Sequence, residues 1–585
     1  MENVRLSALR AQMKKHNIDV YYLNTSDYHM SEYVPLYFKT IEYFSGFSGS
    51  LATLLIDTKK SYIFVDGRYH LQADKQCLPN DVEVIKLGTS NALEPIEFIK
   101  KNYAGKTIGL DGKRTSIEFA KKLFNEGINI KSLDIYSDLI QNRAPLSKDK
   151  LYELNIEYTG LSRANKLKRV KYILSGKTHI VNNLESIAYI LNLRGNDILY
   201  TPVFLSYLVF YKEDVYLFID LERLDENILD GLYSDGIIIR PYDEYYDFLK
   251  TIKNEIILLD ETKVNYQTYV SIRNHGNKVC NCISIIEEMK SMKNETEIKN
   301  TIEAHIYDGV AMVRFLKWLD EVDKETINEY EAACKLNEFR LSYKAFDLSF
   351  NPIVAYDLNA AMMHYGPTKE NNSQLHNRSV LLVDSGGQYK EGTTDITRTI
   401  YLGPVSDEFK KHFTYVLKSM LNLSSVKFMK GLSGNQVDIL ARKDIWELGI
   451  DYRCGTGHGV GQVLSVHEAP PNIRYMHSAS RSEEIPLRKG NVVSDEPGIY
   501  LDGKYGIRCE NLLLVENDEL NEYGQFMHFR TLTMVPFDLR LIDKKYLNDR
   551  QVELLNNYHK EVYETLSPYL NEEERAYLLK ITRAI

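Results

Sequence analysis

The sequence predicts a multidomain protein of mixed α/β and α+β class, on three observations. The chain has 585 residues, of which 44% are apolar, and this length exceeds what one hydrophobic core usually organises. Strand-like apolar runs alternate with helical patterns through the first half. The second half carries paired strands with acidic residues and ends in a helical stretch. We expect four domains, at 1–147, 148–282, 283–538 and 539–585.

The first two domains are both expected to be α/β. Apolar runs at 19–23 and 51–56 predict strands, and the pattern at 69–77 predicts a helix among them. The same alternation begins again near Lys148, after a charged segment that contains Pro145. This repetition indicates an internal duplication, although no residue-level repeat is evident.

The third domain contains a pair of strands that each offer one carboxylate. The apolar run 380–383 leads into Asp384, and a glycine-containing turn separates it from Asp395 on an alternating strand, eleven residues later. If the strands pair antiparallel, both carboxylates can point to one face. Like charges so placed are unfavourable unless a cation lies between them. A lone aspartate of this kind is usually solvated, so the metal hypothesis needs further residues.

Three more candidate ligands follow on short apolar-flanked segments. His458 lies in GTGHGVG, Glu496 in SDEPG and Glu510 in GIRCEN. GTGHGVG lacks the spacing of a dinucleotide-binding loop. One imidazole and four carboxylates are too rich in oxygen for a structural zinc site, and they suit Mn²⁺ or Co²⁺. With bridging carboxylates, five such ligands can hold two ions.

The motifs, taken in order, resemble those of a known family. DSGGQYKEGTTDITRT, GTGHGVG followed by HEAP, SDEPG and GIRCEN are similar to those of the M24 metallopeptidases with the pita-bread fold. Within that family the chain most resembles the three-domain, cytosolic-type Xaa-Pro aminopeptidases. The resemblance implies two creatinase-like N-terminal α/β domains, a pita-bread catalytic domain and a short helical C-terminal extension.

The resemblance also implies a role for each ligand. Asp395 and Glu510 are expected to bridge two divalent ions, with Asp384 completing one site and His458 and Glu496 completing the other. Mn²⁺ is the expected metal, with Co²⁺ and Zn²⁺ as alternatives.

Four further residues are expected to lie near the metal ligands. By resemblance, His364 and His467 are catalytic, stabilising the transition state and positioning substrate, although either alone would more often be a loop histidine without chemistry. Arg508 is expected to hold a metal-ligating carboxylate in place. Cys454 stands where relatives carry a histidine, so that histidine's role is not transferred, and we expect the thiol to pack behind the ligands.

The implied activity is release of the N-terminal residue from peptides with proline in the second position. Hydroxide activated by two metal ions would attack the Xaa-Pro bond. Because the proline nitrogen carries no N–H, selectivity is expected from an apolar pocket, with Tyr365 as a candidate lining residue. The alternatives are a proline dipeptidase or another M24 aminopeptidase, or a catalytically silent pita-bread protein that binds peptides. Presence of all five ligands favours an enzyme.

Composition argues against several classes of partner. A net charge of −9, a pI of about 5.9 and the lack of a basic block argue against nucleic acid and membrane surfaces. We expect no signal peptide and no membrane-spanning segment. Six cysteines without a pairing pattern indicate reduced thiols and a cytoplasmic location. Peptides are the expected substrates, and the resemblance implies a homodimer.

Overall fold

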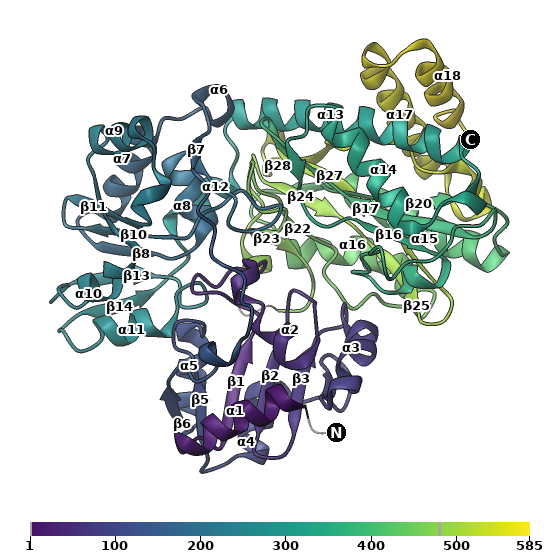
Figure 1. Ribbon diagram of the computed structural model, residues 1–585. Helices are drawn as coiled ribbons and strands as arrows, with labels where there is room; N and C mark the ends of the chain where they lie inside the picture. The colour runs from purple at the N-terminus through teal and green to yellow at the C-terminus, as the bar shows by residue number, and fades with distance from the viewer. Residues whose placement is uncertain (1–2, 478–480) are drawn as a thin grey trace. The chain divides into compact units, whose positions relative to one another are not determined.

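The computed structural model describes residues 3–477 and 481–585, which form two compact units (Figure 1). Unit 1 comprises Met1–Ile156 and Leu161–Glu288, and unit 2 comprises Glu157–Gly160 and Met289–Ile585. In the described ranges, no helix combines the length and the apolar character that a membrane crossing requires.

Unit 1 contains two six-stranded sheets that have the same topology. The first has the order β4-β3-β2-β1-β5-β6, in which β1, β2 and β3 are antiparallel neighbours and the outer pairs are parallel. Its strands are β1 (Val20–Asn24), β2 (Thr53–Asp57), β3 (Ser61–Val65), β4 (Glu83–Lys86), β5 (Thr107–Leu110) and β6 (Asn129–Ser132).

The second sheet repeats this plan, with the order β12-β11-β10-β8-β13-β14 and the same strand directions. Its strands are β8 (Thr178–Val181), β10 (Ser206–Tyr211), β11 (Asp214–Ile219), β12 (Ile237–Pro241), β13 (Ile256–Leu259) and β14 (Lys278–Asn281). The shared topology supports the duplication that the alternating pattern predicted.

The two repeats meet through equivalent helices, α5 (Ile117–Asn125) and α11 (Tyr266–Ile272). Their N-cap residues, Ser116 and Asn265, pair with each other as an antiparallel bridge. Two reciprocal backbone hydrogen bonds flank the bridge, from Ile117 N to Val264 O at 3.0 Å and from Tyr266 N to Thr115 O at 2.7 Å. The joint is therefore symmetric at the level of single residues.

Unit 2 begins with a long helix, α13 (Glu295–Glu321), whose first turn is closed by a capping box on Asn294. Helix α14 (Glu329–Leu341) follows and packs against it. A three-stranded sheet has the order β16-β17-β20, with strands β16 (Ile353–Tyr356), β17 (Val380–Ser385) and β20 (Ile396–Tyr401).

The larger sheet of unit 2 has six strands in the order β21-β28-β27-β24-β22-β23. Its strands are β21 (Lys427–Met429), β22 (Gly457–Gly459), β23 (Glu468–Ile473), β24 (Val492–Asp495), β27 (Asn511–Asn521) and β28 (Gly524–Thr531). Helices α15 (Asp407–Ser424) and α16 (Gly434–Trp446) pack together, and the hairpin of β25 (Gly498–Leu501) and β26 (Tyr505–Arg508) also belongs to this unit.

The C-terminal segment forms two helices, α17 (Asp549–Leu566) and α18 (Glu572–Ile581), drawn in yellow in Figure 1. Their apolar residues join one core with those of α15, because Leu555 and Leu578 are fully buried in the same cluster as Phe413 and Leu417. The tail is therefore part of the packed unit, as its helical spacing predicted.

Candidate metal centre

Strand pairing brings the first two carboxylates together. In the antiparallel pair β17 and β20, Asp384 lies opposite Thr397. Asp395 is two residues before Thr397, so it lies at the diagonal position on the same face. Both aspartates are buried, with exposed fractions of 8% and 5%. The two side chains thus share one buried face, as the motif predicted.

The larger sheet supplies the two glutamates in the same manner. Asp495 and Asn511 pair at the ends of β24 and β27, and Glu496 and Glu510 each lie one residue beyond that pair. The backbone N–H of Glu510 donates to Thr397 O at 3.2 Å, which joins this sheet to the one that carries the aspartates. Two strand pairs from different sheets therefore converge on one point.

His458 lies between two glycines that permit close strand packing. A Cβ on Gly457 would lie 1.8 Å from Ser494 O, and one on Gly459 would lie 2.1 Å from Glu468 O. The imidazole Nδ1 donates to Gly459 O at 2.9 Å, so a neutral ring presents its Nε2 lone pair. This Nε2 lies 3.5 Å from Asp395 Oδ2 and 3.3 Å from Glu496 Oε1.

The cluster fits divalent cations. The ligand atoms of Asp395, His458 and Glu510 lie within 4.8 Å of one another. Three buried oxygens, Asp384 Oδ1, Asp395 Oδ1 and Glu510 Oε1, have no hydrogen-bond partner among the described residues. Burial and the neighbouring carboxylates raise the pKa of Asp384 to about 7 and that of Glu510 well above its ordinary value. A cation would satisfy these oxygens and offset the repulsion between the carboxylates.

Arg508 and two hydroxyl groups orient the carboxylates. The guanidinium of Arg508 forms an ion pair with Asp384, and it donates to Tyr500 Oη at 2.6 Å and to Thr397 Oγ1 at 2.9 Å. Thr397 in turn donates to Glu510 Oε2 at 2.8 Å. The arginine therefore supports one carboxylate directly and a second one through Thr397.

Sequence reasoning missed Thr397, Tyr500 and Ser494. The hydroxyl of Ser494 accepts from the backbone N–H of His458 at 2.9 Å and lies 3.2 Å from Glu496 Oε1, to which it donates. A usable signal existed for two of them, since Thr397 is two residues after a candidate ligand and Ser494 is two residues before one. Side chains at that spacing share a strand face.

The two candidate catalytic histidines lie in different surroundings. The rings of His467 and His458 make an edge contact, with 4.3 Å between their centroids. His364 is partly buried in a turn after the short helix Asp357–Ala361, and the carbonyl of the preceding Met363 accepts from Arg508 at 3.4 Å. The structure thus places both near residues of the cluster, His467 by ring contact and His364 through its neighbour in the chain.

Two other expected residues serve packing in this structure. Cys454 is partly buried against the core of unit 2, and its carbonyl accepts from Arg442 at 2.6 Å. Tyr365, the candidate for a proline pocket, is 8% exposed and donates from its hydroxyl to Glu329 at 2.7 Å. The Tyr365 ring packs with Leu382 in a small core, so it is committed to structure.

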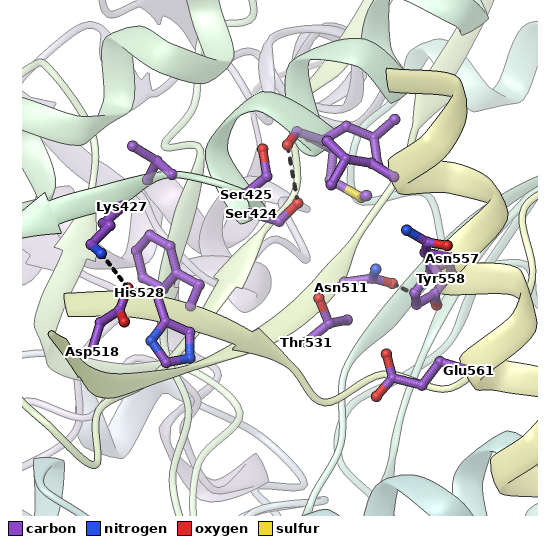
Figure 2. Close-up of a pocket in the computed structure, with 15 residues that line it drawn as sticks. Ser424, Ser425, Lys427, Asn511, Asp518, His528, Thr531, Asn557, Tyr558 and Glu561 are labelled. Atoms are coloured by element: carbon purple, nitrogen blue, oxygen red, sulfur yellow. Dashed lines mark hydrogen bonds and ion pairs between the residues drawn. The ribbon is translucent and has the colours of Figure 1, made fainter. Parts of the chain in front are cut away.

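A groove of about 460 Å³ lies elsewhere in unit 2, between α15, the β27–β28 hairpin and α17 (Figure 2). None of the described residues that line it is a candidate ligand.

Arg398 connects the buried edge of this groove to the metal-site strand segment. It donates to the side chain of Asn511, which lines the groove, at 2.8 Å. It also donates to Glu510 O at 2.5 Å and to Tyr558 Oη at 3.0 Å. Through these bonds, tail helix α17 supports the start of β27 and the adjacent backbone at Glu510.

Comparison with known proteins first identifies the class. Residues 299–517 match Metallopeptidase family M24, and residues 525–585 match the C-terminal region of peptidase M24. Residues 5–140 and residues 142–297 each match the Creatinase/Prolidase N-terminal domain. The fold, together with the cluster of carboxylates and imidazole, defines a member of the M24 metallopeptidases.

Relatives that match over nearly the whole chain indicate which group of M24 metallopeptidases it resembles. The chain is 34% identical to the probable Xaa-Pro aminopeptidase P of Laccaria bicolor, over 98% of this chain and 91% of the relative. It is 35% identical to that of Sordaria macrospora, over 97% of each. The X-prolyl aminopeptidase of Caenorhabditis elegans, described as a cytosolic enzyme with a di-nuclear active site, has a TM-score of 0.94 at 29% identity and 99% coverage of both chains.

The chain therefore belongs to the Xaa-Pro aminopeptidase P family. The family and the fold class predicted from the motifs are both confirmed.

Proposed function

We propose that this chain is a metal-dependent aminopeptidase that releases the N-terminal residue from peptides with proline in the second position. The observation that carries the proposal is the cluster of three buried carboxylates with the partly buried Glu496 and His458, in which three carboxylate oxygens are left without partners. Relatives of nearly full length named Xaa-Pro aminopeptidase P support the substrate class.

The five clustered residues are the proposed ligands of two divalent ions. Asp395 and Glu510 would contribute to both ions, Asp384 to one, and His458 and Glu496 to the other. When bound, the ions would activate water and polarise the scissile carbonyl. We infer Mn²⁺ as the metal, because carboxylates dominate the donor set.

The chain's own side chains would orient the ligands and handle protons. Arg508 holds Asp384 by an ion pair, and Thr397 holds Glu510 by a hydrogen bond, so both carboxylates keep their direction. His467 and His364 are the proposed catalytic histidines. An imidazole beside the reacting carbonyl can donate to the developing oxyanion or move a proton to the departing proline nitrogen.

We also infer a cytoplasmic location and a homodimer. The six cysteines, all described, form no disulfide, which fits a reducing compartment, and the Caenorhabditis elegans relative is described as cytosolic. The homodimer follows from resemblance to the family. Size-exclusion chromatography with light scattering tests the dimer.

The first experiment is hydrolysis of three peptides by metal-stripped protein, with and without added Mn²⁺. The peptides are a tripeptide with proline second, an Xaa-Pro dipeptide and a Met-Ala-Ser control. We expect Mn²⁺-dependent release of the first residue from the proline tripeptide alone. Cleavage of the dipeptide alone would make the protein a proline dipeptidase. No cleavage despite two bound ions would favour a silent peptide-binding protein.

A further inference from the structure

One loop joins the metal-ligating histidine to a catalytic histidine. Residues 460–467 connect β22, which carries His458, to His467 just before β23. Within this loop Val463 has a φ of 53°. A β-branched side chain enters this left-handed region only where its surroundings hold it there. The shape of the loop is held by a backbone bond within it, from Gly461 N to Ser465 O at 3.0 Å, together with contacts from outside, such as the bond from the Gln388 amide to Leu464 O at 2.8 Å.

Lys293 bonds both ends of this loop. Its ammonium donates to Val460 O at 2.5 Å and to Glu468 Oε1 at 2.9 Å, and the lysine side chain is 2% exposed. Val460 is two residues beyond His458, and Glu468 directly follows His467. A single buried cation thus ties together the two segments that carry the imidazoles.

The main chain around Lys293 is anchored as well. The backbone N–H of Lys293 donates to Gly490 O at 2.9 Å, and the side-chain amide of Asn491 donates to Ser291 O at 3.0 Å. Residue 490 lies two positions before β24, the strand that leads to Glu496. The backbone of Lys293 is therefore anchored to the segment that leads into β24.

A second lysine contacts the same carboxylate but not the loop carbonyl. Lys290 Nζ lies 3.1 Å from Glu468 Oε2, and its side chain is 3% exposed. Among the described residues, neither Lys290 nor Lys293 pairs with another carboxylate, so two buried ammonium groups share one carboxylate. An excess buried charge is unfavourable for stability. Packing alone therefore does not account for both lysines.

We propose that Lys293 is a positioning residue for the aminopeptidase reaction. By bonding Val460 O and Glu468 at once, it fixes the imidazole that ligates metal relative to the imidazole that acts on substrate. The inference rests on the proposed function. Lys290 serves as the internal comparison, because it forms an ion pair with the carboxylate without contacting the loop carbonyl.

The test compares Lys293→Met with Lys290→Met in the metal-loaded protein. Each variant leaves one lysine and one glutamate buried, so the net charge is matched and the variants differ in the bond to Val460 O. We expect Lys293→Met to lower kcat on the proline tripeptide about 10- to 100-fold, with KM within about threefold and both ions retained. Lys290→Met should keep kcat within about threefold of the wild type.

Cobalt substitution gives a readout that needs no substrate. Reorientation of His458 should shift the visible absorption of the Co²⁺-loaded Lys293→Met protein, whereas Lys290→Met should match the wild type. Equal losses of kcat in the two variants, or an unchanged cobalt spectrum in Lys293→Met, would overturn the inference. A wild type that cleaves none of the peptides would contradict the proposed function, while the spectra would still decide the role of Lys293.

If Lys293→Met does not fold, the pair Lys293→Gln and Lys290→Gln replaces it, with folding checked by circular dichroism. These amides are smaller changes in polarity and keep the charge match. We expect the same order, with kcat several-fold lower in the variant at 293. Equal kcat in this pair would also overturn the inference.

Discussion

Unit 2 contains two kinds of buried charge cluster, and their difference separates a binding site from a structural element. In the pair formed by Arg442 and Asp438, both side chains are fully buried and Nε lies 2.6 Å from Oδ2. The other carboxylate oxygen accepts from Thr456, so Asp438 is fully partnered. Asp395 and Glu510 are also buried, yet each keeps an oxygen without a partner. Burial alone does not mark a site, whereas several buried carboxylate oxygens without partners, gathered at one point, do.

Removing one proposed bridging ligand should have the largest effect. Asp395→Asn keeps the shape of the side chain but removes its charge, so we expect loss of at least one ion and a fall in kcat/KM of about 10⁴-fold, or about 5.4 kcal/mol. Activity assays and metal analysis check this, and circular dichroism should match the wild type. An active variant with two ions would contradict the five-ligand set.

Breaking the compensated pair should affect stability and leave the metals in place. Arg442→Met strands the buried carboxylate of Asp438, and we expect about 3–5 kcal/mol less unfolding free energy. Urea denaturation of the metal-loaded protein measures this, and metal analysis should still find two ions. If Arg442→Met lost metal but kept its stability, the pair of Arg442 and Asp438 would belong to the metal site and would not be a structural element.

Removing the metal ions with a chelator should lower the free energy of unfolding, because the carboxylates of the proposed metal site then repel one another. Ions that bind the folded chain at 100 times their dissociation constant contribute about 2.7 kcal/mol. We therefore expect the melting temperature to fall on chelation and to recover with added Mn²⁺. Asp395→Asn should respond less, since one repelling carboxylate is already neutral. Identical responses in variant and wild type would show that the stabilising ions bind elsewhere.

A buried group that avoids charge should give the smallest effect near neutral pH, where it is seen only as the onset of a pH dependence. Burial lowers the pKa of His559 to about 3, and its Nε2 accepts from the backbone N–H of Phe537 at 3.0 Å, which requires a neutral ring. The unfolded chain takes up this proton near pH 6.5, so the contribution of His559 to stability falls as pH drops from 6.5 toward 3.

His559→Gln keeps an acceptor but cannot titrate. The unfolding free energy of this variant should therefore fall less steeply as the pH drops. Below pH 6 its slope should be smaller than that of the wild type by about 1.4 kcal/mol per pH unit. Denaturation curves at several pH values measure the slope. Parallel slopes in variant and wild type would contradict a buried neutral imidazole.

The sequence predicted which acidic and imidazole side chains come together better than it predicted the residues that support them. Asp384, Asp395 and His458 stood out because each occurs in a short motif of acidic or imidazole groups beside apolar strands. Asp438 and Arg442 are spaced like an ordinary exposed helical pair, and spacing alone does not reveal burial. The link from Tyr558 to Glu510 joins segments far apart in the chain, which local patterns cannot detect. The internal repeat in unit 1 is clear from the strand order of its two sheets, although no residue-level repeat is evident in the sequence.

The reciprocal joint within unit 1 has a consequence for how the two repeats associate. Ser116 and Asn265 are equivalent residues that pair with each other, and the flanking hydrogen bonds are exchanged in both directions. Such self-complementary contact is the geometry of a two-fold symmetric dimer. Within one chain, the two repeats make through these atoms the kind of contact that two copies of a single repeat would make as a dimer. Because the two repeats are covalently joined, this contact does not depend on protein concentration.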